Sequence, residues 1–266
     1  HRAGGSVAMR ITTSMIQRNI LADLNALSEK LARTQTKASS GKEITRPSDD
    51  PYGAAKAVGL RQTLAANAQY ARNIQDAQGW QDATESALDA ITTYVQRAHD
   101  LLVRGANDTA DPTSREAIAS EIDQIIQGVK ESANATYGDK YLMSGTATSV
   151  APYELGANDA YQGDDAGVVR EIGPGVSLTI NTVAREILGD GQAAGDGKLL
   201  NVLRDIADHL RADDGAALRG GDMTSLKTRF DIARTIIDFN SQAAAYQASL
   251  RAGANIVQAS LMDFLR

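Results

Sequence analysis

Few side chains in this sequence have the types and the spacing that catalysis or zinc binding requires. His99 and His209 are far apart and form neither an HxxxH nor an HxxE pair, so they do not match a helical zinc site. We interpret both histidines as surface or boundary residues. Ser144 lies in a Met-Ser-Gly sequence that lacks the first glycine of the GxSxG motif around a hydrolase nucleophile.

Glycine and aspartate are concentrated between residues 189 and 197, a composition that suits phosphate or calcium binding. The run matches neither the GxxxxGK[ST] phosphate loop nor the spaced carboxylates of an EF-hand, so we interpret it as a connector. The paired aspartates fit helix capping at Asp50 and turns at 164–165 and 213–214. No residue is therefore assigned a catalytic, cofactor-binding or metal-binding role, and the sequence predicts neither enzymatic activity nor a cofactor.

The overall composition argues against several other classes of function. A formal net charge of −6 and a pI near 5.1 do not suit a nucleic-acid-binding surface. The absence of cysteine removes disulfides, thiolate metal sites and cysteine nucleophiles. No apolar run approaches the roughly 20 residues that a membrane-spanning helix needs. With 266 residues, the chain is long enough to bury a substantial core.

The first residues are expected to lie outside the fold. Residues 1–8 have the character of an expression remnant, because a histidine precedes a Gly-Gly-Ser linker, and Met9 is the expected native start. The residues after Met9 lack the basic and apolar regions of a signal peptide. If the protein leaves the cell, we expect a route that needs no cleaved signal.

Composition divides the chain into helical flanks and a glycine-rich middle. The segment from Gly138 to Gly197 holds 11 of the 23 glycines, whereas the flanks have helical apolar spacing. We predict a mainly α protein with a β-rich insertion, in which the N- and C-terminal segments form an elongated helical bundle or coiled coil. The predicted parts are an assembly helix at 9–48, a helical rod at 49–136, a β-rich outer domain at 137–195, a helical return at 196–230 and a second assembly helix at 231–266.

Turn and capping residues place the elements within this plan. Gly41 is expected to end the first helix, and the Asp-Pro pairs at 50–51 and 111–112 are expected to begin the next two. Helical spacing resumes at 199–210, and Trp80, the only tryptophan, is expected to pack in the core or between helices. Strands are predicted at 140–144, 168–172 and 176–183.

Both ends of the chain carry the narrow apolar seam of a coiled-coil helix. Apolar residues recur there in alternating steps of four and three, which places them on one helix face. Seams at both ends suggest helices that pair with each other and with other subunits. The predicted assembly-interface residues are Ile20, Leu24, Leu27, Leu31, Ile236, Phe239, Tyr246, Leu250, Val257, Leu261 and Phe264.

Residues 39–51 read SSGKEITRPSDDP and precede an alanine-rich helix, a combination that resembles the N-terminal region of bacterial flagellin-like proteins. The Pro-Ser-Asp-Asp-Pro form is similar to that of the hook-associated protein 3 branch, the hook–filament junction proteins. Residues 9–12, the Tyr-Leu-Met-Ser-Gly segment at 141–145 and the final residues 258–265 are also similar to that branch. The resemblance covers nearly the whole chain after residue 8.

The resemblance implies a structural subunit of the bacterial flagellum. Such proteins are extracellular adapters between a hook-side junction protein (hook-associated protein 1) and flagellin, and self-association in a ring is expected. The flagellar type III apparatus exports them without a cleaved signal, and a cytoplasmic export chaperone holds the C-terminal helix. The family also implies that the terminal helices form an inner assembly domain and that the β-rich middle projects outward.

Two alternatives accompany this interpretation. The first is flagellin itself or a minor filament subunit, against which the Pro-Ser-Asp-Asp-Pro form argues. The second is a coiled-coil binding module whose β segment grips a glycan or a host protein through Tyr137, Tyr141, Tyr153 and Tyr161. Neither nucleic-acid binding nor membrane insertion is expected.

We also predict that a few tens of residues are absent near residues 230–232. Family members usually carry a longer helical stretch before the final heptads, and the apolar row at Ile232 begins without a preceding helix cap. The helix predicted from Pro51 to Ala106 would span roughly 84 Å, whereas Asp231 to Arg266 would return only about 54 Å.

Overall fold

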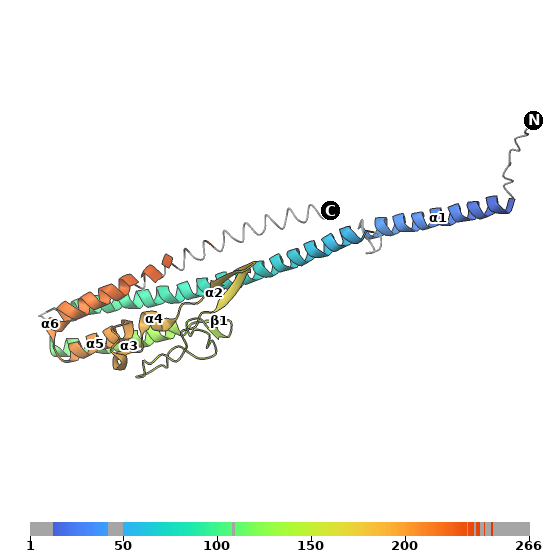
Figure 1. Cartoon of the computed structure of the whole chain (residues 1–266). Helices are drawn as coiled ribbons and strands as arrows, with labels where there is room; N and C mark the ends of the chain where they lie inside the picture. The colour runs from blue at the N-terminus through green and yellow to red at the C-terminus, as the bar shows by residue number, and fades with distance from the viewer. Residues whose placement is uncertain are drawn as a thin grey trace, which may run out of the picture. The chain divides into compact units, whose positions relative to one another are not determined.

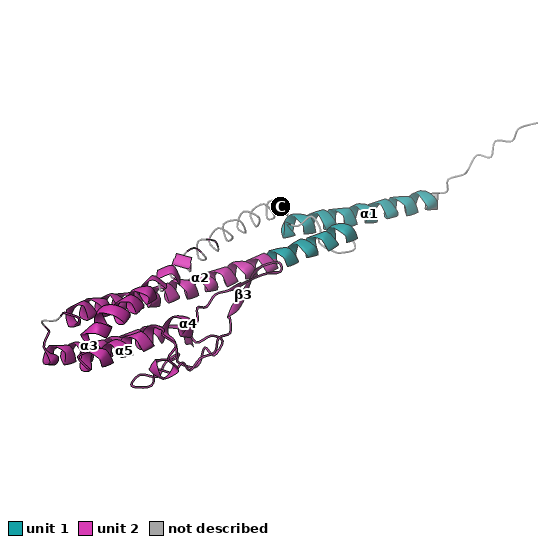
Figure 2. Ribbon diagram, turned by 60° about the vertical axis from the view of Figure 1, so that its left-hand side comes forward, with its two compact units in different colours: residues 1–64, 265 teal, residues 65–264, 266 magenta. Residues whose placement is uncertain are grey.

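The computed structural model describes residues 13–41, 50–107, 110–232, 234–236, 238, 239, 242 and 246 (Figure 1). They belong to two compact units, one of residues 1–64 and one of residues 65–264, with the last two residues divided between the units (Figure 2). None of the helices in the described part combines the length and the apolar character that crossing a membrane requires.

The first unit contains helix α1 (Thr13–Ser40) and the beginning of α2 (Pro51–Gly105). α1 ends where predicted, because Gly41 has a φ of +64° and its N–H donates to the carbonyl four residues earlier at 3.0 Å. Glycine adopts this left-handed conformation at little cost. The predicted cap of α2 is also confirmed, since Asp50 Oδ1 accepts the N–H of Gly53 at 2.9 Å and proline occupies the first helical position.

The second unit is built on the remainder of α2, on α3 (Pro112–Ala133), on α5 (Leu199–Arg211) and on a helical stretch at residues 223–232. α3 begins as predicted, with Asp111 Oδ1 accepting the N–H of Ser114 at 2.6 Å. The apolar rows predicted in this unit meet in one core, and Trp80 belongs to it, as expected. Buried core residues include Leu88, Ile91, Val95, Leu102, Ile122, Ile126, Val129, Leu203, Ile206 and Leu210.

Polar contacts and one close approach join the helices of the second unit. Arg97 of α2 donates to Glu121 of α3 at 2.9 Å. Arg204 of α5 donates to Asp123 of α3 at 2.9 Å. Gly128 of α3 leaves room for a tyrosine ring of α2, since a Cβ built on Gly128 would lie 2.4 Å from the nearest atom of that ring. Any side chain at this position would therefore displace the ring.

Two arginines satisfy carbonyl groups where α2 ends. Arg115 of α3 donates to Gly105 O at 3.1 Å and to Asn107 O at 3.2 Å. Arg219 donates to Ala106 O at 3.2 Å. Carbonyls at a helix C-terminus lack intrahelical partners and form the negative end of the helix dipole. The two guanidinium groups therefore stabilise the end of α2 and the turn that follows it.

The middle of the chain contains two short antiparallel hairpins. β1 (Thr136–Tyr137) pairs with β2 (Lys140–Tyr141), and β3 (Val169–Gly173) pairs with β4 (Val176–Thr179). The rest of this region consists of loops, the short helix α4 (Ala184–Leu188) and the 3-10 turn η1 (Gln192–Ala194). The predicted combination of a helical body with a smaller β-containing insertion is confirmed.

Two predicted strands are shorter than expected, because their last residues form hydrogen bonds with loops and side chains and not with a neighbouring strand. The strand predicted at 140–144 ends at residue 141, since the buried residues that follow bond to three separate segments and not to one neighbouring strand. The strand predicted at 176–183 ends at residue 179. There the side chain of Asn181 accepts the N–H of Val168 at 2.7 Å in place of a backbone carbonyl.

A continuous helical path crosses the position where a missing segment was predicted. After α5, the short helix α6 (Gly215–Ala217) and the π-helical turn η2 (Leu218–Asp222) lead into the helical residues 223–232. Ile232 therefore needs no cap in front of it, because its helix begins well before it. The proposed deletion stays a prediction, and the length of the encoding gene tests it.

Candidate assembly surface

α1 presents apolar side chains along one face. Alternating steps of four and three keep them within about 60° of one another around the helix axis. Four of them form what we call the α1 row: Ile20, Leu24, Leu27 and Leu31. Their exposed fractions lie between 53% and 69%. Glu29 and Arg33, on the opposite face, form an exposed ion pair at 3.8 Å.

Because the α1 row is exposed, burying it against a partner would release a large free energy. Full burial of a leucine or isoleucine side chain contributes about 1.5–3 kcal/mol. Single exposed apolar residues are common on protein surfaces, whereas a contiguous apolar patch marks an interaction site. A helix also owes most of its stability to packing and little to propensity. α1 is therefore arranged as a contact element, although its assignment as an assembly interface stays a prediction.

The predicted C-terminal interface lies only partly within the described residues. Ile236 is half-buried against the core of the second unit, so it contributes to the folded body. Phe239 and Tyr246 are 69% and 60% exposed. The remaining predicted interface residues lie outside the described part of the chain: Leu250, Val257, Leu261 and Phe264.

The residues considered for chemistry make structural contacts. His99 is a boundary residue at the surface of α2, with its side chain 45% exposed. Ser144 is buried, and its Oγ donates to Ala147 O at 3.1 Å. Among the residues that the structure describes, no group of three or more histidine, cysteine, aspartate or glutamate side chains could hold a metal ion.

His209 and Asp222 form a polar pair between α5 and the π-helical turn η2. The two side chains meet at 2.8 Å, between His209 Nδ1 and Asp222 Oδ2. The hydrogen bond to Asp222 raises the pKa of His209, and the nearby carboxylates of Asp214 and Asp205 act in the same direction. Burial raises the pKa of Asp222. The pair connects α5 to the turn that leads into residues 223–232, which is a structural role.

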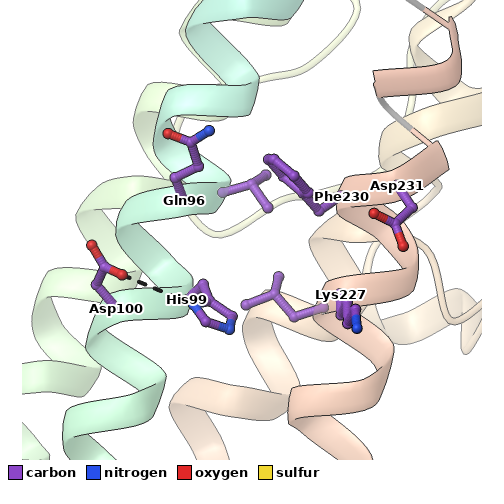
Figure 3. Close-up of a pocket in the computed structure, with 8 residues that line it drawn as sticks. Gln96, His99, Asp100, Lys227, Phe230 and Asp231 are labelled. Carbon is purple, nitrogen blue, oxygen red and sulfur yellow. Dashed lines mark ion pairs between the residues drawn. The ribbon is translucent and has the colours of Figure 1, made fainter.

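A groove of about 540 Å³ lies between α2 and the helical residues 223–232 (Figure 3). Val95, Leu226 and Phe230 supply its apolar lining, and His99 and Lys227 lie on opposite sides. Groups of both charge signs line the groove, without the few convergent polar groups that characterise a small-molecule site. The lining residues after position 222 were not predicted, although the steps of three and four at Met223, Leu226 and Phe230 are typical of an apolar helix face.

Three of the four tyrosines suggested for ligand binding make internal contacts. Tyr153 is buried, and its hydroxyl donates to Gly189 O at 2.6 Å. The Tyr161 hydroxyl contacts Met143 O at 3.1 Å. Burial raises the pKa of both phenols. Tyr137 packs edge-on against Trp80 with ring centroids 6.3 Å apart. These contacts stabilise the second unit, so the three rings have structural roles there.

Solved structures share the fold of this chain. A putative flagellar hook-associated protein from Vibrio parahaemolyticus has a TM-score of 0.72 at 20% identity, covering 83% of this chain and 99% of that chain. FlgL of Bacillus cereus has a TM-score of 0.65 at 20% identity, covering 78% of this chain and 99% of that chain. At this identity, the likeness shows a common fold.

The curated relatives of this chain are flagellar proteins. Flagellar hook-associated protein 3 of Escherichia coli K12 is 32% identical over 200 residues, which cover 70% of this chain and 62% of that protein. The protein of the same name from Salmonella typhimurium LT2 is 29% identical over 180 residues, 67% of this chain and 56% of its own length. Flagellin of Clostridium tyrobutyricum is 29% identical over 174 residues, 65% of this chain and 44% of that protein. The chain thus spans about three fifths of the two hook-associated relatives.

Residues 11–148, more than half of the chain, match the family model of the bacterial flagellin N-terminal helical region. The matched span contains the 39–51 motif and helices α1, α2 and α3. This match confirms the resemblance that the motif indicated, and the chain belongs to the flagellin family.

Proposed function

We propose that this chain is a structural subunit of the bacterial flagellum and serves as an adapter at the hook–filament junction. The exposed α1 row carries the proposal, because such a row has a favourable free energy of burial that only a partner can supply. The two relatives named flagellar hook-associated protein 3 support the placement at the hook. In this proposal segments 9–48 and 231–266, which the sequence predicts as assembly helices, make the contacts, and the region 137–195 faces outward.

The proposed partners follow from the same role. The hook-side junction protein, hook-associated protein 1, and flagellin are the axial neighbours, and copies of the chain associate in a ring. A cytoplasmic chaperone binds the C-terminal helix before export, which proceeds through the flagellar type III apparatus without a cleaved signal peptide. The mature subunit is extracellular and has no enzymatic activity.

The test is a charge substitution in the α1 row. Leu27→Asp places a carboxylate in an apolar contact, where an unpaired charge is strongly unfavourable. We expect co-assembly with purified flagellin or with the hook-side protein to fail, while thermal unfolding of the second unit is unchanged. Ala22→Asp adds the same side chain on the opposite face of α1 and should assemble normally. Normal assembly of Leu27→Asp would contradict the proposal.

Flagellin or a minor filament subunit is the alternative, and the match to Clostridium tyrobutyricum flagellin supports it. Its alignment covers less of this chain and of the relative than the Escherichia coli alignment does. Self-assembly of the purified chain into long filaments would favour a filament subunit. Binding to filament ends without self-polymerisation would favour the adapter.

A further inference from the structure

A loop of the outer region wraps its backbone around a buried ammonium group. The side chain of Lys130, in α3, is fully buried. Its Nζ lies 2.8 Å from Gly156 O, 2.8 Å from Asn158 O and 3.3 Å from Glu154 O. The carboxylate of Asp159 lies 2.5 Å from the same Nζ. Three carbonyl oxygens and one carboxylate therefore converge on one cation.

Two side-chain amides hold the same loop on either side of Lys130, one from α3 and one from Asn134, the residue that caps the end of α3. Gln127 donates to Gly156 O at 3.0 Å and accepts the Gly156 N–H at 2.8 Å. Asn134 donates to Tyr153 O at 2.8 Å and accepts the Tyr153 N–H at 2.9 Å. Each amide thus pairs with both backbone groups of one residue, as an adjacent strand would. α3 recognises this loop mainly through its backbone.

The loop directs its own side chains away from α3. Residues 154–158 are exposed, whereas Tyr153 and Asp159, which flank them, are buried. Asp159 also accepts a hydrogen bond from Arg204 of α5 at 2.8 Å. Burial alone would raise the pKa of Asp159, but the hydrogen bonds from Arg204 and Lys130 hold it below its ordinary value. We call residues 153–159 the strap.

The charge on Lys130 explains why this arrangement is stable. A buried ammonium group is unfavourable unless acceptors surround it. Carbonyl oxygens that converge on one point also repel one another unless a cation lies between them. Backbone carbonyls and carboxylates also surround the cation in calcium-binding loops, so the oxygen ligands of Lys130 are of a type that binds cations elsewhere.

We propose that the strap is a cation-binding cage, filled in this chain by the Lys130 ammonium group, and that its conformation depends on the cation and not on its exposed side chains. The ligand class that suits the cage is a primary alkylammonium ion, since the group that it binds here is a primary ammonium on an unbranched chain. The cage holds an outward-facing loop in one conformation while positions 155 and 157 tolerate change.

The first test removes the charged end of the side chain and keeps an unbranched side chain that is one atom shorter. In Lys130→Met we expect the amide exchange of Tyr153 and Gly156 to accelerate by at least about 100-fold, because breaking a buried charge pair is costly. Amides in the core of α3 and α5 should stay protected. Lys140→Met, which removes an exposed lysine at the start of β2, is the matched control and should leave both amides unchanged. Unchanged protection of Gly156 in Lys130→Met would overturn the proposal.

The second test refills the cage. Lys130→Ala lacks three carbons and the nitrogen of the native side chain, so propylammonium replaces what was removed and 1-propanol is the uncharged control. We expect saturable recovery of Gly156 protection with propylammonium and none with 1-propanol. Equal recovery with both would show that filling apolar space suffices, and recovery with neither would show that no cage exists. If Trp80 fluorescence shows loss of the core in Lys130→Ala, the Lys130→Met result decides.

The third test examines the exposed side of the strap. Leu155→Ser and Ala157→Ser change side chains that point outward, and neither removes a bond to α3. We expect the exchange rates of Tyr153 and Gly156 to stay within about threefold of the original values, in line with other surface substitutions. A large acceleration in either variant would show that the strap's own side chains determine its conformation.

Discussion

The same apolar spacing has opposite outcomes in the two units. In α2, the apolar residues that recur in steps of three and four between Leu88 and Leu102 are buried in the core of the second unit. In α1, the same steps leave Leu24 and Leu31 more than half exposed. Among the described residues of the first unit, no side chain is buried. A heptad pattern therefore indicates that a helix has a partner, but not that the partner belongs to the same chain.

The largest difference in the free energy of unfolding is expected between a substitution in a buried apolar row and one in the exposed α1 row. Ile126→Ala removes a fully buried side chain, and we expect it to lower the free energy of unfolding by about 2–5 kcal/mol. Leu27→Ala, in the α1 row, should change that free energy by less than about 0.5 kcal/mol. Urea denaturation of the isolated chain measures both. Similar losses for the two variants would show that the α1 row is already buried within the isolated chain.

A smaller effect is expected at the end of α2. Arg115→Met removes two charge-assisted hydrogen bonds to carbonyls at and just after the end of α2, together with an ion pair to Asp213, and we expect a loss of about 1.5–3 kcal/mol in the free energy of unfolding. Arg104→Met alters an exposed arginine in the last turn of α2 and serves as the control. Equal stability of the two variants in urea would mean that the end of α2 does not depend on Arg115.

His209 should make the stability of the second unit depend on pH. Because its folded pKa is raised above 6.5, the stabilisation from the protonated ring is complete below pH 6.5 and is lost as the pH rises through the raised value. At alkaline pH the Asp222 carboxylate faces Asp205 and Asp214 without the imidazolium charge. We expect His209→Gln to lose more stability at pH 6 than at pH 9. Equal losses at both pH values would contradict a contribution from the protonated histidine.

The smallest effect is expected at the contact between Trp80 and Tyr137. Edge-on aromatic pairs contribute about 0.5–1.5 kcal/mol, so Tyr137→Leu should reduce stability by that amount. It should also change the emission of Trp80, the only tryptophan. Tyr52→Leu, at a side chain that is 81% exposed, is the control and should leave both quantities unchanged.

Features that depend on neighbouring residues were predicted well. The helix end at Gly41 and the helix starts at Asp50 and Asp111 follow from hydrogen bonds between residues three or four positions apart. The strap was not predicted, because the hydrogen bond from Lys130 to Asn158 joins residues 28 positions apart. The shortened strands were missed for a related reason, since Asn181 replaces a backbone pair with its side chain.

The family, the helical flanks and the apolar rows can be inferred from the sequence, because they depend on residue types at short, regular spacings. Which rows are buried and which stay exposed depends on the segments that pack against each helix, so it becomes known only from the folded chain. Only the folded chain shows that Lys130, a residue type seldom buried, lies at the centre of a cage. That position becomes stable only when four oxygen atoms from a distant loop surround its charge.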